Sequence, residues 1–182
     1  MFTSRSGISK FLVVAVCLCL VACTATQILT DINLALNAAE AILPIVLPLL
    51  NQGPNPVVST ARVTQILNWV RAGLTGVGEV SACQAQGGTS AVLAACVTSN
   101  LAGVVASVPD LAGLPANIAN VVQSFASDLE KLLKQYGTQP GAKASNDKTV
   151  IHFGAAQQKE LSSFRARVDV AKLRIDAALE KK

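Results

Sequence analysis

Residues 115–137 read PANIANVVQSFASDLEKLLKQYG and contain the most regular helical pattern in the chain. Their apolar side chains recur every three or four residues over about five turns, which is the spacing of one face of an α-helix. Pro115 suits the first turn of such a helix, and Gly137 suits its end. The face consists of Ile118, Val121, Val122, Phe125, Leu129, Leu132, Leu133 and Tyr136. The stretch therefore predicts an amphipathic helix that buries one side.

Three more helices are predicted before this one. They cover residues 31–50, residues around a stripe at 63–77, and residues from 89 or 90 to about 108. Segments rich in Gly and Pro, at 51–60 and 109–115, separate them and mark turns. The sequence therefore predicts an all-α fold, a helical bundle of about four core helices, followed by a charged amphipathic helix at the C-terminus.

The first of these helices has predictable ends. Thr30 or Asp31 is expected to be its N-cap, because short oxygen-bearing side chains bind the free backbone N–H groups there. The residues just before it, Thr24 to Thr30, are expected to form a short tether. Pro44 and Pro48 each remove a backbone donor, so we expect a kink or an early end near Leu43.

The helix over 31–50 is apolar on nearly all sides. Such a helix is either buried in a protein core or placed in lipid. Asn37 and Glu40 argue against a membrane span, so a central core helix with a bent end is the favoured interpretation.

Three glycines, Gly73, Gly76 and Gly78, fall in the last part of the second helix. Each lowers helix propensity by up to about 1 kcal/mol relative to alanine. Two interpretations remain open: the small residues let another helix approach closely, or the helix frays there before a turn.

The C-terminal part of the chain differs in composition from the rest. A polar linker at 137–149 contains no apolar residue except alanine, and VIHF at 150–153 suits a small strand or a plug against the bundle. A fifth helix is predicted from Ala155 to Glu180. Its apolar stripe is Leu161, Phe164, Val168, Ala171, Ile175 and Ala178. One apolar stripe against a charged back is typical of a helix docked on a bundle or on a partner helix.

The segment 148–182 holds eight basic and four acidic residues. A basic helix of this kind can dock on an anionic polymer, a lipid headgroup or an acidic envelope protein. The alternative is a solvated outer face of the same bundle.

Cys83 and Cys96 lie thirteen residues apart on either side of a turn at Gly87-Gly88. In an oxidising compartment such a pair predicts a disulfide, which stabilises by about 3 kcal/mol in the chain-entropy model. The alternative is two buried small residues on neighbouring helices.

The N-terminus has the features of a secretory signal peptide. Arg5 and Lys10 precede an uncharged run from Phe11 to Ala22, which has small residues before a cut site. The run is about twelve residues long, which is short of the ~20 that a membrane-spanning helix needs. Cys17 and Cys19 within it are interpreted as small apolar residues.

The end of this run, Leu20-Val21-Ala22-Cys23, resembles the lipobox of bacterial lipoproteins. The resemblance covers the targeting segment alone. It implies that residues 1–22 are removed as a signal peptide and that Cys23 is the lipid attachment site, carrying fatty acids such as palmitate. The mature chain would then comprise an apolar helical bundle at 23–136, the linker at 137–149 and the segment 150–182. The alternative is ordinary cleavage near Ala22, which leaves a free secreted chain.

The same resemblance implies a location. A diacylated cysteine supplies the two chains that stable membrane anchoring needs. Thr24 follows Cys23 in place of the aspartate that retains lipoproteins in the inner membrane. We therefore expect a lipid anchor in the cell envelope, in the outer membrane if the host is Gram-negative.

Catalytic motifs were not found: the chain has no GxSxG, phosphate-binding loop, HExxH or CxxC. The lone histidine, His152, lies between two apolar residues, a setting typical of packing. Cysteine and histidine ligands are too few for zinc. Without the signal peptide, 13 basic and 11 acidic residues remain, so the net charge of about +2 gives no reason to expect nucleic acid.

Two functions fit these features. The first is a non-enzymatic, lipid-anchored envelope protein with a structural, adaptor or partner-binding role and no cofactor beyond the lipid on Cys23. The second is a binding or transport module for an apolar ligand or lipid, since residues 28–122 hold more apolar residues than a small bundle requires.

Overall fold

The computed structural model of the chain describes residues 6–53, 56–86, 88–137, 150–151 and 153–181, and it describes only the backbone at 6–25, 88–90 and 150–151. The helices in these ranges are α1 (Ser6–Val46), α2 (Thr60–Gln86), α3 (Ser90–Ala106), α4 (Ala116–Leu132) and α5 (Ala155–Glu180). A 3₁₀ turn, Leu47–Asn51, continues α1, and a π-helical turn, Leu133–Gly137, continues α4. Two short strands, β1 (Gly88–Thr89) and β2 (Val150–Ile151), pair in antiparallel fashion. The predicted all-α helical bundle is confirmed.

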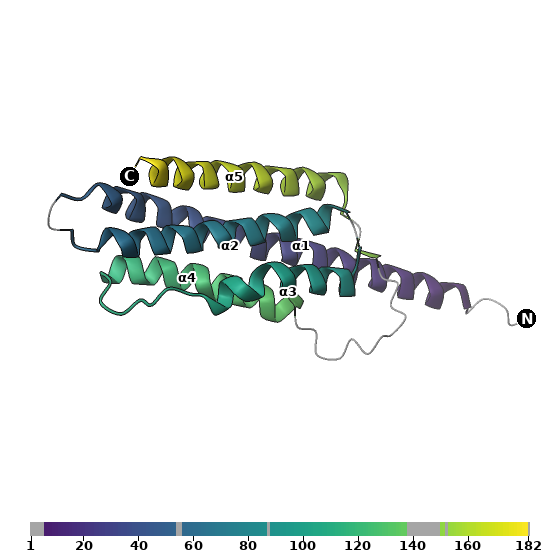
Figure 1. The fold of residues 1–182 in the computed structure, drawn as a ribbon. Coiled ribbons are helices and arrows are strands. Elements are labelled where there is room, and N and C mark those ends of the chain that lie inside the picture. The colour runs from purple at the N-terminus through teal and green to yellow at the C-terminus, as the bar shows by residue number, and fades with distance from the viewer. Residues whose placement is uncertain (1–5, 54–55, 87, 138–149, 152, 182) are drawn as a thin grey trace, which may run out of the picture.

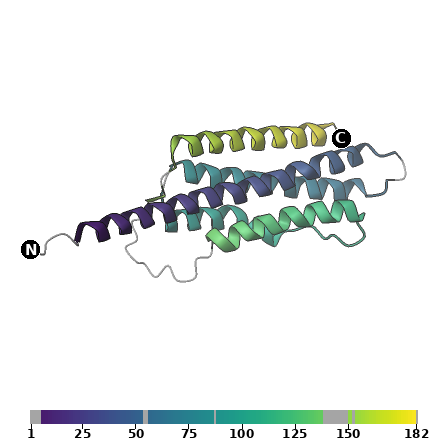
Figure 2. The ribbon, with the colours of Figure 1, turned by 180° about the vertical axis from the view of Figure 1, so that it is seen from behind.

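The helices pack in three layers. α5 lies on one side, α1 and α2 form the middle, and α3 and α4 lie on the other side (Figure 1). α1 contacts α2, α4 and α5, and α2 contacts α1, α3 and α5, so these two helices form the centre of the bundle. The view from behind shows the N-terminal part of α1 extending beyond the other helices (Figure 2). α5 runs in the same direction as α1, and α2 and α4 run in the opposite direction.

The start of α1 differs from the sequence prediction. Neither Thr30 nor Asp31 caps the helix, and Thr24–Thr30 is not a tether, because α1 continues through these residues from Ser6. The physical reason is that no proline interrupts residues 6–43. The Thr30 hydroxyl donates to the carbonyl of Thr26, four residues earlier, at 2.9 Å, as hydroxyls do inside helices.

The predicted kink or early end of the helix near Leu43 is confirmed to within a turn. Pro44 lies inside α1, the α-helix ends at Val46, and the chain tightens into the 3₁₀ turn. A proline cannot donate to the carbonyl four residues earlier, so the helical hydrogen bonding is interrupted in this region.

The apolar residues of α1 contribute to the hydrophobic core. By length and composition, residues 26–51 would suffice to cross a membrane. In the bundle, however, one side of α1 is buried against its neighbours, as expected for a core helix. The buried apolar residues are Ile28, Leu29, Ile32, Ala35, Leu36, Ala39, Ile42, Leu43 and Val46.

The glycines of α2 allow close approach, and α2 does not fray at them but continues to Gln86. A Cβ atom on Gly73 would lie 2.7 Å from the ring of Phe125, on α4. A Cβ atom on Gly76 would lie 2.7 Å from the backbone oxygen of Asn100, on α3. Neighbouring helices therefore occupy the space that side chains would need.

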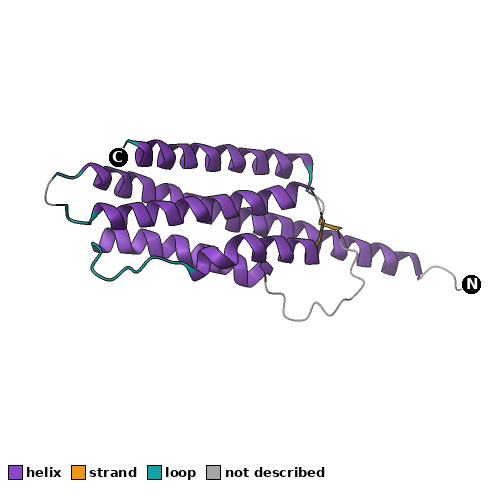
Figure 3. Cartoon of the chain, in the orientation of Figure 1, coloured by secondary structure: helices purple, strands orange, loops and turns teal. Residues whose placement is uncertain are grey.

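α5 has the predicted bounds, and its apolar stripe is buried against α1 and α2. Of the predicted stripe, Leu161, Phe164, Val168, Ala171 and Ile175 are buried. The segment before it supplies β2, in agreement with the small strand considered for VIHF. Figure 3 shows the strand pair at the end of the bundle beyond which α1 extends. His152 lies outside the described residues.

Candidate functional site

The predicted lipid attachment residue, Cys23, lies within α1. Its side chain is outside the described part of the chain. Among the residues of α1 whose side chains are described, the first buried one is Ile28, which belongs to the hydrophobic core. Five residues of helix correspond to about 7 Å along the axis. A core residue thus lies close to Cys23 along α1.

A covalent link stabilises the same end of the bundle. Cys83 of α2 and Cys96 of α3 form the predicted disulfide, with their Cα atoms 6.6 Å apart. The closed loop contains β1, whose Gly88 and Thr89 pair with Ile151 and Val150 of β2. The disulfide therefore joins α2 to α3 beside the strand that leads into α5.

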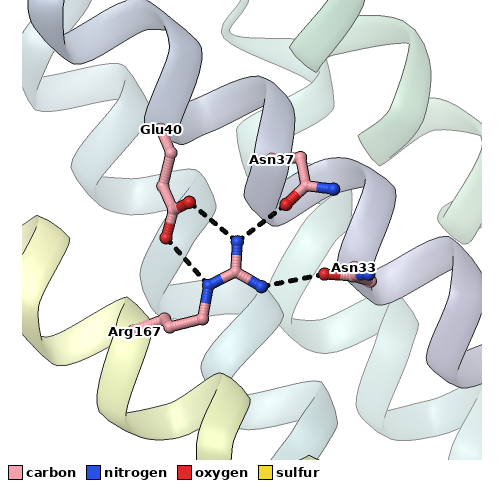
Figure 4. Close-up of polar contacts among 4 residues, drawn as sticks. All are labelled: Asn33, Asn37, Glu40 and Arg167. Carbon is pink, nitrogen blue, oxygen red and sulfur yellow. Dashed lines mark hydrogen bonds and ion pairs between the residues drawn. The ribbon is translucent and has the colours of Figure 1, made fainter.

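Arg167 of α5 forms a polar cluster with three residues of α1 (Figure 4). It donates to Asn33 Oδ1 at 2.9 Å and to Asn37 Oδ1 at 2.7 Å. It also donates to both carboxylate oxygens of Glu40, at 3.0 and 2.7 Å. We call these four residues the Arg167 clamp.

The spacing of the α1 residues explains the clamp. Asn33, Asn37 and Glu40 are separated by four and three residues, so they lie on one face of a helix. A guanidinium group is planar and has five N–H donors, so it can bind several oxygens in one plane. The Arg167 and Glu40 side chains are about one third exposed. The clamp thus fixes the position of α5 along α1 at a partly solvated boundary.

A second polar cluster joins α1 to α4 and its π-helical turn. Asp31 is 4% exposed and accepts hydrogen bonds from Lys131 Nζ and Tyr136 OH, each at 2.7 Å. The hydrogen bond and the attraction of Asp31 raise the pKa of the half-exposed Lys131 ammonium above its ordinary 10.5. Burial raises the pKa of the Tyr136 phenol well above its ordinary 10.0, and the hydrogen bond to Asp31 is a second, smaller cause in the same direction. Near neutral pH both groups keep their protons, so the cluster fastens the helices.

Asp128 lies one turn before Lys131 on α4. Burial raises the pKa of its carboxyl group above 3.8, and the nearby Lys131 opposes this change. Asp31 and Asp128 repel each other when both are ionised, which adds to the upward direction. Lys131 thus attracts both carboxylates, Asp31 and Asp128.

A third contact joins α2 to α5. Arg71 Nε lies 2.6 Å from Asp176 Oδ1, and Arg71 Nη2 donates to Asp176 Oδ2 at 3.2 Å. Arg165 of α5 reaches the backbone oxygen of Ser81 at 3.4 Å. Two of the basic residues of α5, Arg165 and Arg167, therefore make their hydrogen bonds with the bundle.

No protein family model, curated protein or solved structure matches this chain. Its function therefore has to be argued from its own residues. Within the described ranges, no three His, Cys, Asp or Glu side chains gather as a metal site would require.

Sequence reasoning missed both polar clusters. Asp31 was interpreted as a helix cap, and Asn37 and Glu40 only as evidence against a membrane span. The available signal was the spacing of Asn33, Asn37 and Glu40 on one helical face, together with a predicted C-terminal helix rich in arginine. Which arginine would meet that face depends on how the two helices are aligned, and the sequence pattern does not fix that alignment.

Proposed function

We propose that this chain is a non-enzymatic, lipid-anchored protein of the bacterial cell envelope with a structural, adaptor or partner-binding role. The observation that carries the proposal is the contiguous pattern Leu20-Val21-Ala22-Cys23, which follows a basic start and a short apolar run. Ile28, a buried core residue, lies five residues after Cys23. Diacylation of Cys23 would then place the bundle directly against the membrane surface.

Further features support an envelope location. The Cys83–Cys96 disulfide suits an oxidising compartment. Thr24, in place of aspartate, favours the outer membrane in a Gram-negative host. No cofactor is required other than the lipid on Cys23.

The partner-binding role is assigned to α5, for an envelope protein or an anionic polymer. Its inner stripe is occupied by the bundle, so a partner would meet its outer face. The alternative function is the binding or transport of an apolar ligand. It depends on residues 28–122 holding more apolar residues than a small bundle requires. Many of these residues pack against one another in one core, which weakens that argument.

The test is fatty-acid labelling in a bacterial host, read by intact mass and by membrane fractionation. Wild type is expected to be labelled, membrane-bound and to start at Cys23, whereas Cys23→Ala is unlabelled. Cys19→Ala is the matched control, since it removes a cysteine from the discarded run and should be labelled like wild type. An unlabelled wild type that is soluble outside the cytoplasm would overturn the lipobox interpretation.

A further inference from the structure

α5 has a second apolar stripe on the side opposite its buried one. Its members are Ala166, Val170, Leu173 and Ala177, which follow one another at spacings of four, three and four residues. All four are exposed; Val170 is 49% and Leu173 is 67% exposed. We call this set the outer stripe. Spacing of this kind is that of the a and d positions of a coiled coil, here with Val170 and Ala177 at a, and Ala166 and Leu173 at d.

Charged residues border the outer stripe in a consistent order. Asp169 and Asp176 directly precede the a residues and so occupy g positions. Arg167, Arg174 and Lys181 lie one residue after d positions and so occupy e positions. One border is therefore acidic and the other basic.

This order distinguishes the two ways in which two such helices can pair. In a parallel pair, each g residue faces the e residue five positions later on the other helix. Asp169 would then meet Arg174 of a second copy, and Asp176 would approach its Lys181. In an antiparallel pair g faces g and e faces e, which brings aspartate to aspartate and arginine to arginine. The charges favour the parallel arrangement.

Asp169 and Arg174 carry most of this argument. Both are exposed, and within the described part of the chain neither takes part in an ion pair. By contrast, Asp176 is bound to Arg71 and Arg167 belongs to the clamp. An anionic polymer is less well matched, because Asp169 lies in the middle of the same face.

We propose that the partner of α5 is α5 of a second copy of this chain, paired in parallel through the outer stripe. Because α1 runs in the direction of α5, a parallel pair brings the two α1 N-termini to the same end. Both copies can then be anchored in one membrane, a consequence that rests on the proposed function. The stripe is short and half of it is alanine, so pairing is weak in solution and is promoted where anchoring confines the chains to a surface.

The first test is oxidative crosslinking of the full chain in membranes. In the parallel pair each stripe position meets itself, so Ala166→Cys alone gives a covalent dimer, as does Ala177→Cys alone. In an antiparallel pair position 166 meets position 177, so only a mixture of the two variants crosslinks. Asn120→Cys, exposed on α4 on the other side of the bundle, is the control, and wild type reports the native cysteines. We expect at least about fivefold more dimer for Ala166→Cys than for Asn120→Cys, because a disulfide forms only where Cβ atoms approach closely.

The second test exchanges charges in the Ala166→Cys background. Asp169→Arg, or Arg174→Asp, is expected to lower crosslinking on the order of tenfold, since a two-fold axis repeats each pair and like charges then meet. The double exchange, Asp169→Arg with Arg174→Asp, should restore it. Equal crosslinking at Ala166 and Asn120, crosslinking only in the mixture, or failure of the double exchange to restore dimer each overturns the proposal.

Fatty-acid labelling of the same samples separates this proposal from the previous one. A labelled chain without the Ala166 dimer overturns the pairing alone. An unlabelled chain that crosslinks at Ala166 and Ala177 supports the pairing and overturns the anchor.

Discussion

Arg167 of α5 donates to both carboxylate oxygens of Glu40 on α1, at 3.0 and 2.7 Å, although 127 residues separate them in the chain. A two-oxygen contact of this kind restricts orientation as well as distance. Together with Asn33 and Asn37, it determines which turn of α5 faces which turn of α1 (Figure 4).

Replacing Arg167 tests the energetic contribution of the clamp. Arg167→Ala is expected to lower the free energy of unfolding by about 1–2 kcal/mol, because hydrogen bonds to partly exposed groups are lost and water can replace some of them. Urea denaturation measures the change. Lys159→Ala, an exposed change on the same helix, should stay within about 0.5 kcal/mol of wild type. Equal values for the two variants would mean that the clamp contributes no stability.

Asp31→Asn tests the cluster between α1 and α4. The substitution is nearly isosteric but removes the charge that Lys131 and Tyr136 bind. It also places the NH₂ donor of the new amide beside the Lys131 and Tyr136 donors. A loss of about 2 kcal/mol is expected in thermal or urea unfolding. Tyr136→Phe should lose about 1 kcal/mol, since Asp31 retains Lys131. A larger loss for Tyr136→Phe than for Asp31→Asn would contradict the central role of the carboxylate.

The same cluster predicts a loss of stability at alkaline pH. The pKa values of Lys131 and Tyr136 are raised in the folded state, from 10.5 and 10.0. A group with a raised native pKa contributes stability that is fully present below its unfolded pKa and is lost as pH rises through the native pKa. Unfolding free energy should therefore fall above about pH 10. The fall should be shallower in Asp31→Asn, and an identical slope would exclude the cluster as its source.

Gly76→Ala tests the close packing of α2 and α3. Alanine favours the helix by up to about 1 kcal/mol, but its Cβ would lie 2.7 Å from the backbone oxygen of Asn100, which cannot simply rotate away. A net loss of about 1–3 kcal/mol is expected, as for other overpacked positions. The matched control is Gly103→Ala in α3, where nothing lies within 4 Å of the added Cβ. That variant should be more stable than wild type by about 0.5–1 kcal/mol.

Loss of the disulfide is expected to lower stability by about 3 kcal/mol. The double variant Cys83→Ala/Cys96→Ala and reduced wild type should unfold at similar urea concentrations. Adding a reductant to the double variant should change nothing, which separates the effect of this bond from other effects of the reductant. Unchanged stability on reduction would mean that the closed loop does not constrain the unfolded chain.

The sequence predicted the elements whose signal is local. The bounds of α5, Ala155 to Glu180, follow from a regular apolar stripe in a charged segment, and the disulfide follows from two cysteines beside a turn. The start of α1 was predicted wrongly because Thr30 and Asp31 suit a cap as well as they suit a helix interior with tertiary partners. The sequence left open whether Gly76 allows close helix packing or marks a frayed helix end. The residue that decides between them, Asn100, is distant in sequence.

The candidate site was predicted less completely than the fold. Cys23 was found because the lipobox is a contiguous pattern. The Arg167 clamp was missed because it depends on the alignment of two helices from opposite ends of the chain. The sequence already shows Val170 and Leu173 on the charged side of the predicted helix, and the burial of Leu161 and Val168 shows that this side remains exposed.

The central position of α1 also has a mechanical consequence. A pulling force applied at its N-terminal end acts along the axis of α1, nearly parallel to the seams that it shares with α2, α4 and α5 (Figure 2). Such a load shears the contacts of Asp31, Ala35 and Glu40 together, instead of peeling them apart one after another. The buried contacts of α1 would therefore resist such a force together, and α1 would not slide out of the bundle one turn at a time.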